Sequence, residues 1–339
     1  MEEYMEDMEF VIPNYKVDYE INKVDIYSKL SEGMKKVIDW QTKESDGAFD
    51  TNCSWDELRR KYIKERKFWN EGGPKAYKIT ESKVEGPVGD IPIRLYYPDN
   101  KEKHYVCVFM HGGGFTVGNN DTHDRMMRCL MESGDCAVVG IDYTLSPEQK
   151  FPIQLYECAA VVKYLHKHGD EFGLYTDHMA LAGDSGGGNL AIATNLYLRD
   201  VFSNEYISAL LLFYPTTGLY DGISNRLYGT ELDGMRRCDL EYYDRCYIPK
   251  DADLENPYYR VINNNLTYGV PATYICCGDL DPLLDGCKLL NIILSSHGVK
   301  TEMEIVPGVL HAFMHYGKMM DEAIDCLNNS GAFYKASRE

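Results

Sequence analysis

Residues 179–187, MALAGDSGG, form the stretch that decides the fold of this chain. The stretch begins with an apolar run typical of a buried strand, and residues 187–199 after it have a helical pattern. Glycines on both sides of Ser185 permit a tight turn between strand and helix. The stretch therefore predicts a strand, a sharp turn and a helix, with Ser185 exposed at the turn.

The five residues 183–187, GDSGG, fit the pattern G-x-S-x-G, in which a nucleophilic serine stands on such a turn. The short pattern alone also fits a glycine-rich connection with an incidental serine. It resembles the serine motif of chymotrypsin-like proteases as well, but those proteins are all-β and their histidine and aspartate precede the serine. The position of Ser185 at the carboxyl end of a predicted strand, where α/β sheets bind ligands, favours the nucleophile.

Apolar and alternating runs elsewhere predict eight strands. They span residues 77–84, 91–97, 105–110, 136–141, 178–183, 208–214, 272–278 and 302–307. Helical stretches lie between or after the later strands, at 153–168, 187–199, 283–296 and 317–335. This alternation predicts an α/β fold with a mostly parallel eight-stranded sheet flanked by helices.

Two further segments lie outside this alternation. Residues 1–74 have helical spacing and no strand, so we expect an N-terminal helical segment that contributes to a cap. The interval of about 215–265 is long, has no clear strand and is rich in tyrosine, which favours a cap insertion over a plain surface excursion. Its tyrosines are Tyr220, Tyr228, Tyr242, Tyr243, Tyr247, Tyr258 and Tyr259.

A second glycine-rich stretch, HGGGF at residues 111–115, follows the strand predicted at 105–110. Its backbone amides can stabilise the negative oxygen of a tetrahedral intermediate, each by roughly 3 kcal/mol in a dry site. A phosphate-binding loop would require a following Lys-Ser or Lys-Thr, which is absent. We expect His111 to hydrogen-bond this loop in place and not to act as a base.

With these two stretches, the chain resembles the hormone-sensitive lipase family of α/β-hydrolases, which is marked by HGGG and GDSAGG and includes bacterial esterases and arylacetamide deacetylase. The resemblance covers about residues 75–335, with His123 after the glycine loop and with Asp142-Tyr143 and Ser146-Pro147-Glu148 similar to the family's DYRLAPE stretch. It implies an α/β-hydrolase fold in which residues 75–339 form the catalytic domain.

The resemblance also implies partners for Ser185. Asp281 matches the family's acid before Pro-Leu, and His311 in residues 308–313, GVLHAF, matches the family's base. The rival acids are Asp279 and Asp285, and the rival histidines are His297 and His315.

Amide donors are implied in the same way. Gly113, Gly114 and Gly186 would donate to the oxyanion, and His111 and Asp184 would support the loop. Gly186 stands where the family usually has alanine, so the amide is retained but is expected to be held less firmly.

These residues together predict a serine carboxylesterase that hydrolyses short- to medium-chain acyl esters, such as acetyl esters, through an acyl-enzyme intermediate. Its partner would be a small-molecule ester, with no metal and no organic cofactor. An amidase or deacetylase with the same triad remains open. The other alternative is a non-catalytic ligand-binding protein on the same fold, as in the gibberellin receptor, which has lost the histidine that this chain retains.

Composition restricts the location and the partners of the chain. The net charge of −18 disfavours binding to nucleic acid and anionic membrane. No apolar run is long enough for a membrane span, and eleven scattered cysteines without a C-x-x-C pair argue against disulfides and zinc. Because the start MEEYMEDMEF is acidic and unlike a secretory signal, we expect a cytoplasmic protein. The sequence leaves monomer and homodimer open.

Overall fold

A computed structural model describes residues 16–338. The acidic start MEEYMEDMEF, which is unlike a secretory signal, lies outside these described residues. The strands are β1 (Lys78–Glu85), β2 (Asp90–Tyr97), β3 (His104–Met110), β4 (Ala137–Ile141), β5 (Leu174–Asp184), β6 (Ile207–Phe213), β7 (Ala272–Gly278) and β8 (Thr301–Val306).

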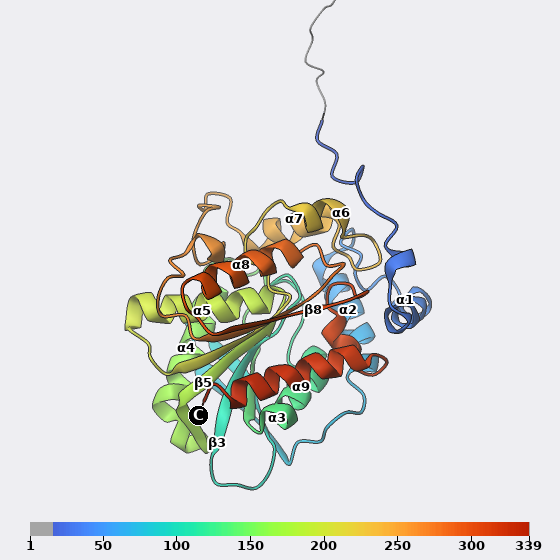
Figure 1. Ribbon diagram of the computed structural model, residues 1–339. Helices are drawn as coiled ribbons and strands as arrows, with labels where there is room; N and C mark the ends of the chain where they lie inside the picture. Colours follow the sequence, from blue (N-terminus) through green and yellow to red (C-terminus); the bar gives the residue numbers. More distant parts are fainter. Residues whose placement is uncertain (1–15, 339) are drawn as a thin grey trace, which may run out of the picture.

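Within the described residues the eight strands form one sheet in the order β1-β2-β4-β3-β5-β6-β7-β8 (Figure 1). β2 is antiparallel to β1 and β4, and the remaining neighbours are parallel. Residues 179–184 of central β5 are all buried, as a strand covered on both faces requires. The mostly parallel eight-stranded sheet predicted from the sequence is confirmed.

Helices cover both faces of the sheet. They are α1 (Glu32–Glu44), α2 (Trp55–Trp69), α3 (Asp124–Gly134), α4 (Ile153–His168), α5 (Gly186–Phe202), α6 (Ile223–Leu227), α7 (Arg237–Tyr247), α8 (Leu284–Ser296) and α9 (Asp321–Lys335). Short 3-10 turns are η1 (Tyr27–Lys29), η2 (Asp121–His123), η3 (Gly169–Phe172), η4 (Val261–Asn263) and η5 (Phe313–Tyr316). Helices α3 and α9 lie on one face, whereas α5 and α8 lie on the other (Figure 1).

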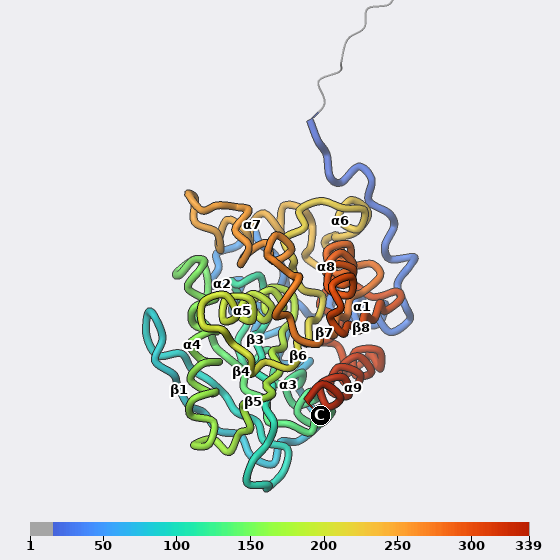
Figure 2. The backbone as a smooth tube through the Cα atoms, turned by 60° about the vertical axis from the view of Figure 1, so that its left-hand side comes forward, coloured from blue at the N-terminus to red at the C-terminus, as the bar shows by residue number. Residues whose placement is uncertain are grey.

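Two segments lie beyond the sheet and its covering helices. Helix α2 begins after Ser54, whose side chain accepts a hydrogen bond from the backbone N–H of Glu57 at 3.4 Å. The chain between β6 and β7, residues 214–271, contains α6, α7 and η4, and no strand among the described residues. Figure 2 shows α6 and α7 at the end of the molecule from which the N-terminal segment extends.

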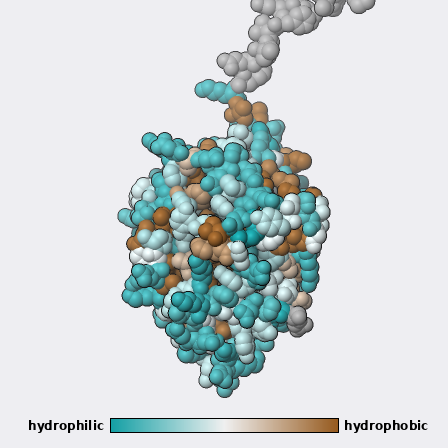
Figure 3. All heavy atoms as spheres, turned by 90° about the vertical axis from the view of Figure 1, so that its left-hand side faces the viewer, coloured by the Kyte–Doolittle hydropathy of each residue, from teal (hydrophilic) through white to brown (hydrophobic). Residues whose placement is uncertain are grey.

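The surface is mainly polar. The face in Figure 3 is dominated by hydrophilic residues, with hydrophobic residues scattered among them. In the part of the chain that the structure describes, no helix has the length and apolar character needed to cross a membrane.

Candidate active site

Ser185 occupies the turn between β5 and α5 in a strained backbone conformation, with φ 54° and ψ −119°. Glycines permit the tight path around it: an added Cβ at Gly183 would lie 2.3 Å from the carbonyl oxygen of Gly187, and one at Gly187 would lie 2.1 Å from that of Met110. Such strain persists only where the surrounding structure enforces it. The turn holds the serine at the carboxyl end of the central strand.

Ser185, His311 and Asp281 form a continuous chain of hydrogen bonds. His311 Nε2 lies 2.9 Å from Ser185 Oγ, and His311 Nδ1 lies 2.7 Å from Asp281 Oδ2. Asp281 is fully buried, and its other carboxylate oxygen accepts the backbone N–H of Leu283 at 2.8 Å. The aspartate therefore orients the histidine ring toward the serine hydroxyl.

The rival residues have other contacts. Asp279 accepts a hydrogen bond from the backbone of Gly308, and Asp285 accepts one from the backbone of Ser224. His297 is exposed at the end of α8. His315 is buried, with Nε2 3.6 Å from Asp184. Among the described residues, none of these four hydrogen-bonds to Ser185.

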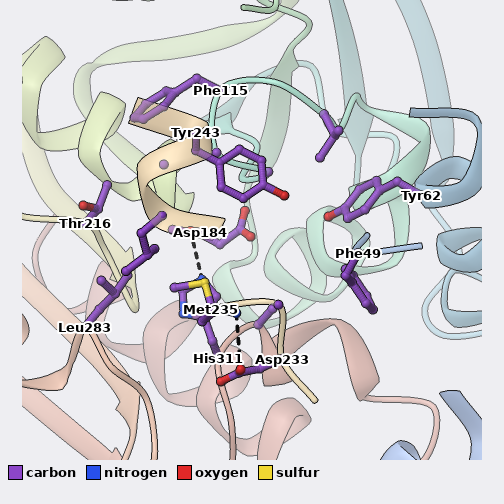
Figure 4. Close-up of a pocket in the computed structure, with 18 of the residues that line it drawn as sticks. Phe49, Tyr62, Phe115, Asp184, Thr216, Asp233, Met235, Tyr243, Leu283 and His311 are labelled. Atoms are coloured by element: carbon purple, nitrogen blue, oxygen red, sulfur yellow. Dashed lines mark hydrogen bonds between the residues drawn. The ribbon is translucent and has the colours of Figure 1, made fainter. Parts of the chain in front are cut away.

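Sequence reasoning missed Asp233, a carboxylate from the segment between β6 and β7 that lines the same pocket (Figure 4). Its Oδ1 accepts the backbone N–H of Thr230 at 2.8 Å and that of Met235 at 3.3 Å. Its Oδ2 is buried with no partner among the described residues. Burial raises the pKa of Asp233 to about 6. No motif surrounds this residue, so the sequence offered no signal for it.

The charge on His311 is set by opposing effects. Burial lowers its pKa, but the negative charges of Asp281 and then Asp233 outweigh burial, so the pKa of His311 is raised. The raised pKa of His311 therefore suits a group that accepts a proton from Ser185, because the protonated ring is stabilised by the carboxylate of Asp281.

The HGGGF loop approaches the same serine from β3. Gly113 and Gly114 have φ values of 114° and 56°, and the N–H of Gly112 donates to Asp184 Oδ1 at 2.8 Å. Within the described residues, no protein acceptor takes the amide hydrogens of Gly113, Gly114 or Gly186. Three backbone donors are thus available in the pocket that contains Ser185.

His111 packs beneath this loop. Its ring stacks on Tyr143 with 4.2 Å between centroids, and the Tyr143 hydroxyl donates to the His111 carbonyl oxygen at 2.7 Å. Its Nδ1 lies 2.9 Å from the carbonyl oxygen of Gly112. Burial, followed by the charge of His123, lowers the pKa of His111 to about 3. A neutral ring at this position can donate to the loop carbonyl.

His123, Asp184 and His315 form a buried cluster whose potential ligand atoms all lie within 4.8 Å of one another. Burial raises the pKa of Asp184, but His123 and His315 outweigh it and hold that pKa well below its usual range. By spacing alone the cluster could hold a metal ion. Asp184 Oδ1, however, already accepts the backbone N–H of Gly112, so this carboxylate is engaged in holding the glycine loop.

Gly186 has a packing reason to lack a side chain. An added Cβ would lie 3.3 Å from the ring of Phe115, which stacks on Tyr247 with 3.7 Å between centroids. A methyl group would press on this stacked pair. Glycine at position 186 therefore leaves room for the aromatic pair beside the serine.

The pocket around Ser185 encloses about 110 Å³. Figure 4 shows Phe49 and Tyr62 at one end, Thr216 and Leu283 at the other, and His311 between them. This volume is small beside the several hundred Å³ usual for ligand pockets. The arrangement can perform nucleophilic acyl transfer on a small substrate.

Known proteins resemble this chain over most of its length. A family model for the α/β-hydrolase fold matches residues 107–315. An acetyl esterase of Salmonella paratyphi A is 40% identical over 321 residues, which cover 93% of this chain and 97% of that protein. An acetyl esterase of Salmonella typhi is 39% identical with the same coverage.

Solved structures share the fold. A hyperthermophilic esterase from the archaeon Pyrobaculum calidifontis has a TM-score of 0.85 and 26% identity, covering 91% of this chain and 98% of that chain. An α/β-hydrolase from the Lake Arreo metagenome has the same TM-score and coverage at 22% identity, which supports the fold alone. The chain therefore belongs to the α/β-hydrolase family, as the resemblance of its glycine loop and serine turn to hormone-sensitive lipases implied.

Proposed function

We propose that this protein is a serine carboxylesterase that hydrolyses short- to medium-chain acyl esters, with acetyl esters preferred. The hydrogen-bonded chain Ser185–His311–Asp281, beside three free backbone amides in one pocket, carries the proposal. The relatives named acetyl esterase and the small pocket support the short acyl group. The chemistry requires a small-molecule ester and water, without a metal or an organic cofactor.

In the proposed mechanism, Ser185 Oγ attacks the ester carbonyl carbon while His311 Nε2 takes its proton. Asp281 orients the imidazole and stabilises the imidazolium. The amides of Gly113, Gly114 and Gly186 donate to the developing oxyanion. His311 then protonates the leaving alcohol, and the acyl group remains on Ser185. A water molecule, deprotonated by His311, releases the acid and restores the serine.

Positioning roles are proposed for two further residues. Asp184 holds the glycine loop through the amide of Gly112, and His111 holds it through the Gly112 carbonyl. Both contacts are buried, so they maintain the direction of the neighbouring amides.

We also propose that the N-terminal helices and the interval 215–265 together form a cap over the catalytic domain, residues 75–339. Phe49 and Tyr62 line the pocket from the N-terminal side, and Met235 and Tyr243 line it from the interval. Side chains from both segments enclose the space beside the serine, which limits the access of bulk water to the site, although the hydrolytic step still requires one water molecule.

A substrate series tests the proposed activity. Rates for p-nitrophenyl esters from acetyl to decanoyl should be highest for the shortest acyl groups and should fall as the chain outgrows the pocket. p-Nitroacetanilide, the amide counterpart of the acetate ester, should turn over far more slowly. No hydrolysis across the ester panel would instead support a ligand-binding protein, and faster anilide turnover would support an amidase.

Gly114→Ala should lower kcat by about 100-fold or more, the effect of misplacing an oxyanion donor. An added Cβ would lie 2.4 Å from Tyr243, and φ at this position is 56°. Steady-state kinetics with p-nitrophenyl acetate measure the loss. Gly298→Ala is the matched control, because its φ is also positive, at 79°, but its Cβ meets open space. Equal losses in both variants would contradict a specific role for the loop.

Asp233→Asn should move the acidic limb of the kcat/KM profile to lower pH. His311 acts as a base only when neutral, and the negative charge of Asp233 raises its pKa. Because the pKa of Asp233 is about 6, this influence is present mainly above that pH. Removing the charge lowers the pKa of His311, so activity should persist further into acid. Asp253→Asn is the control, because Asp253 is an exposed residue of the proposed cap. This variant should leave the kcat/KM profile unchanged.

A cytoplasmic location is proposed on the basis of the cysteines. All eleven are free, and nine of them are buried. Free thiols in this number suit a reducing compartment. Fractionation of cells that express the protein, followed by activity measurements on each fraction, tests this location.

A further inference from the structure

Arg66, on α2, is a buried cation with incomplete hydrogen bonding. Its side chain is 1% exposed; its Nη1 lies 3.2 Å from Glu65 Oε2 without forming a well-directed hydrogen bond, and its Nε donates to no acceptor among the described residues. The guanidinium lies over the rings of Tyr62, Phe49 and Tyr316, at 4.8, 5.3 and 5.6 Å from their centroids. Aromatic rings stabilise the faces of a guanidinium, and in this set only the hydroxyl oxygens of Tyr62 and Tyr316 could accept from its edge N–H groups. Buried donors without acceptors are unfavourable, so an acceptor from outside the chain is expected.

The pocket with Ser185 is where that acceptor can enter, because Arg66 lines it. Arg66 lies over Phe49 and Tyr62, the pair that Figure 4 shows at the end opposite Thr216 and Leu283. The hydroxyl groups of Tyr62, at this end, and of Tyr243, in the middle of the pocket, point toward one another (Figure 4). The end of the pocket beneath α2 is therefore rich in hydrogen-bond donors.

The surrounding charges distinguish between possible ligands. Glu65 Oε2 lies 3.2 Å from Arg66 Nη1, so the positive charge of Arg66 is already balanced. Glu65 is itself held by Trp69 and Gln41, which donate to its Oε1 at 2.7 and 3.0 Å. The carboxylate of Asp184 also lines the pocket. A further anion would add unbalanced negative charge to a buried site, whereas a neutral oxygen would not.

We propose that Arg66 binds a neutral oxygen, a hydroxyl group, in the alcohol part of the substrate. The preferred substrates are then acetates of hydroxylated alcohols, such as polyols, and not acetates of plain alkyl alcohols. This inference rests on the proposed acetyl esterase activity, and it assigns the Arg66 end of the pocket to the alcohol and the opposite end to the two-carbon acyl group.

The test compares substrates of equal size. Glycerol 1-acetate and 2-methylbutyl acetate differ only in that two methyl groups replace two hydroxyl groups, and 3-acetoxypropanoate carries a carboxylate instead. The readout is the ratio of kcat/KM for the glycerol ester to that for the alkyl ester. Because both substrates are assayed with the same protein sample, this ratio does not depend on the fraction of the protein that is folded. Intrinsic differences in ester reactivity cancel when variants are compared with the unmodified protein.

The double variant Glu65→Gln/Arg66→Met removes both charges together, so no unpaired carboxylate remains in the core. The ratio should fall about tenfold, the size expected for one hydrogen bond to a charged donor. Glu65→Gln alone keeps Arg66, and its ratio should stay high. Because its Arg66 charge is no longer balanced, this variant should also turn over 3-acetoxypropanoate better than the unmodified protein does.

An unchanged ratio in the double variant would overturn the proposal, as would a preference of the unmodified protein for 3-acetoxypropanoate over glycerol 1-acetate. If none of the acetates were hydrolysed, the proposed esterase function would fail first. Hydrolysis of all three without an Arg66-dependent preference would overturn only this inference.

Discussion

Ser185→Ala should lower kcat for p-nitrophenyl acetate by roughly 10⁴- to 10⁶-fold, the loss expected when a triad nucleophile is removed. The hydroxyl oxygen is the atom to which the acyl group would be transferred, and His311 Nε2 stands 2.9 Å from it. Without that oxygen no acyl-enzyme can form, although the amides that would bind the oxyanion stay in place. Initial rates at matched protein concentration measure the loss.

A fluorophosphonate probe identifies the nucleophile independently of any substrate. It should add one label to the unmodified protein, at Ser185, and none to Ser185→Ala. Ser295→Ala is the matched control because Ser295 is an exposed serine on α8, remote in sequence from the turn. That variant should retain both turnover and labelling. A label that persists in Ser185→Ala would place the nucleophile elsewhere.

The strand and turn that carry Ser185 could be predicted because their signals are local. An apolar run, glycines and a helical pattern follow one another within a short stretch. The prediction began strand β5 at residue 178, whereas the strand begins at Leu174. Residues 175–178 are all exposed or half-buried, so the apolar run by which a buried strand is recognised starts only after them.

The partners of Ser185 required more than local pattern. Asp281 and His311 are 30 residues apart, and His311 is 126 residues from the serine. Their contact depends on the positions of β7 and β8 in the strand order of the sheet. The periodicity of apolar residues along the sequence does not reveal that order. The family resemblance, through GDLDPL and GVLHAF, was what singled out these two residues. Their roles as acid and base stay predictions for mutagenesis to test.

The proposed cap could be predicted from the sequence only in outline. A long interval without strands could be recognised, but not which of its side chains face the pocket. Tyr243 and Tyr259 line the pocket, whereas Tyr220 is 46% exposed. Asp233 and Arg66 carry no motif, because their importance comes from burial and missing hydrogen-bond partners. Both properties arise only when separate segments pack together.

His311→Ala should lower kcat about as far as Ser185→Ala, roughly 10⁴- to 10⁶-fold, because the serine hydroxyl is a weak nucleophile until a base takes its proton. The double variant Ser185→Ala/His311→Ala should be no slower than either single variant, since the two residues act as a unit. Steady-state rates of the three proteins with p-nitrophenyl acetate test both statements.

The rival histidine supplies the control for this substitution. His297→Ala changes an exposed residue at the end of α8, and it should leave the rate within about twofold of the unmodified protein, as is usual for surface substitutions. Near-normal turnover in His311→Ala would remove His311 as the base. If the two single losses multiplied in the double variant, Ser185 and His311 would contribute independently, and the proton transfer between them could not be the step that activates the serine.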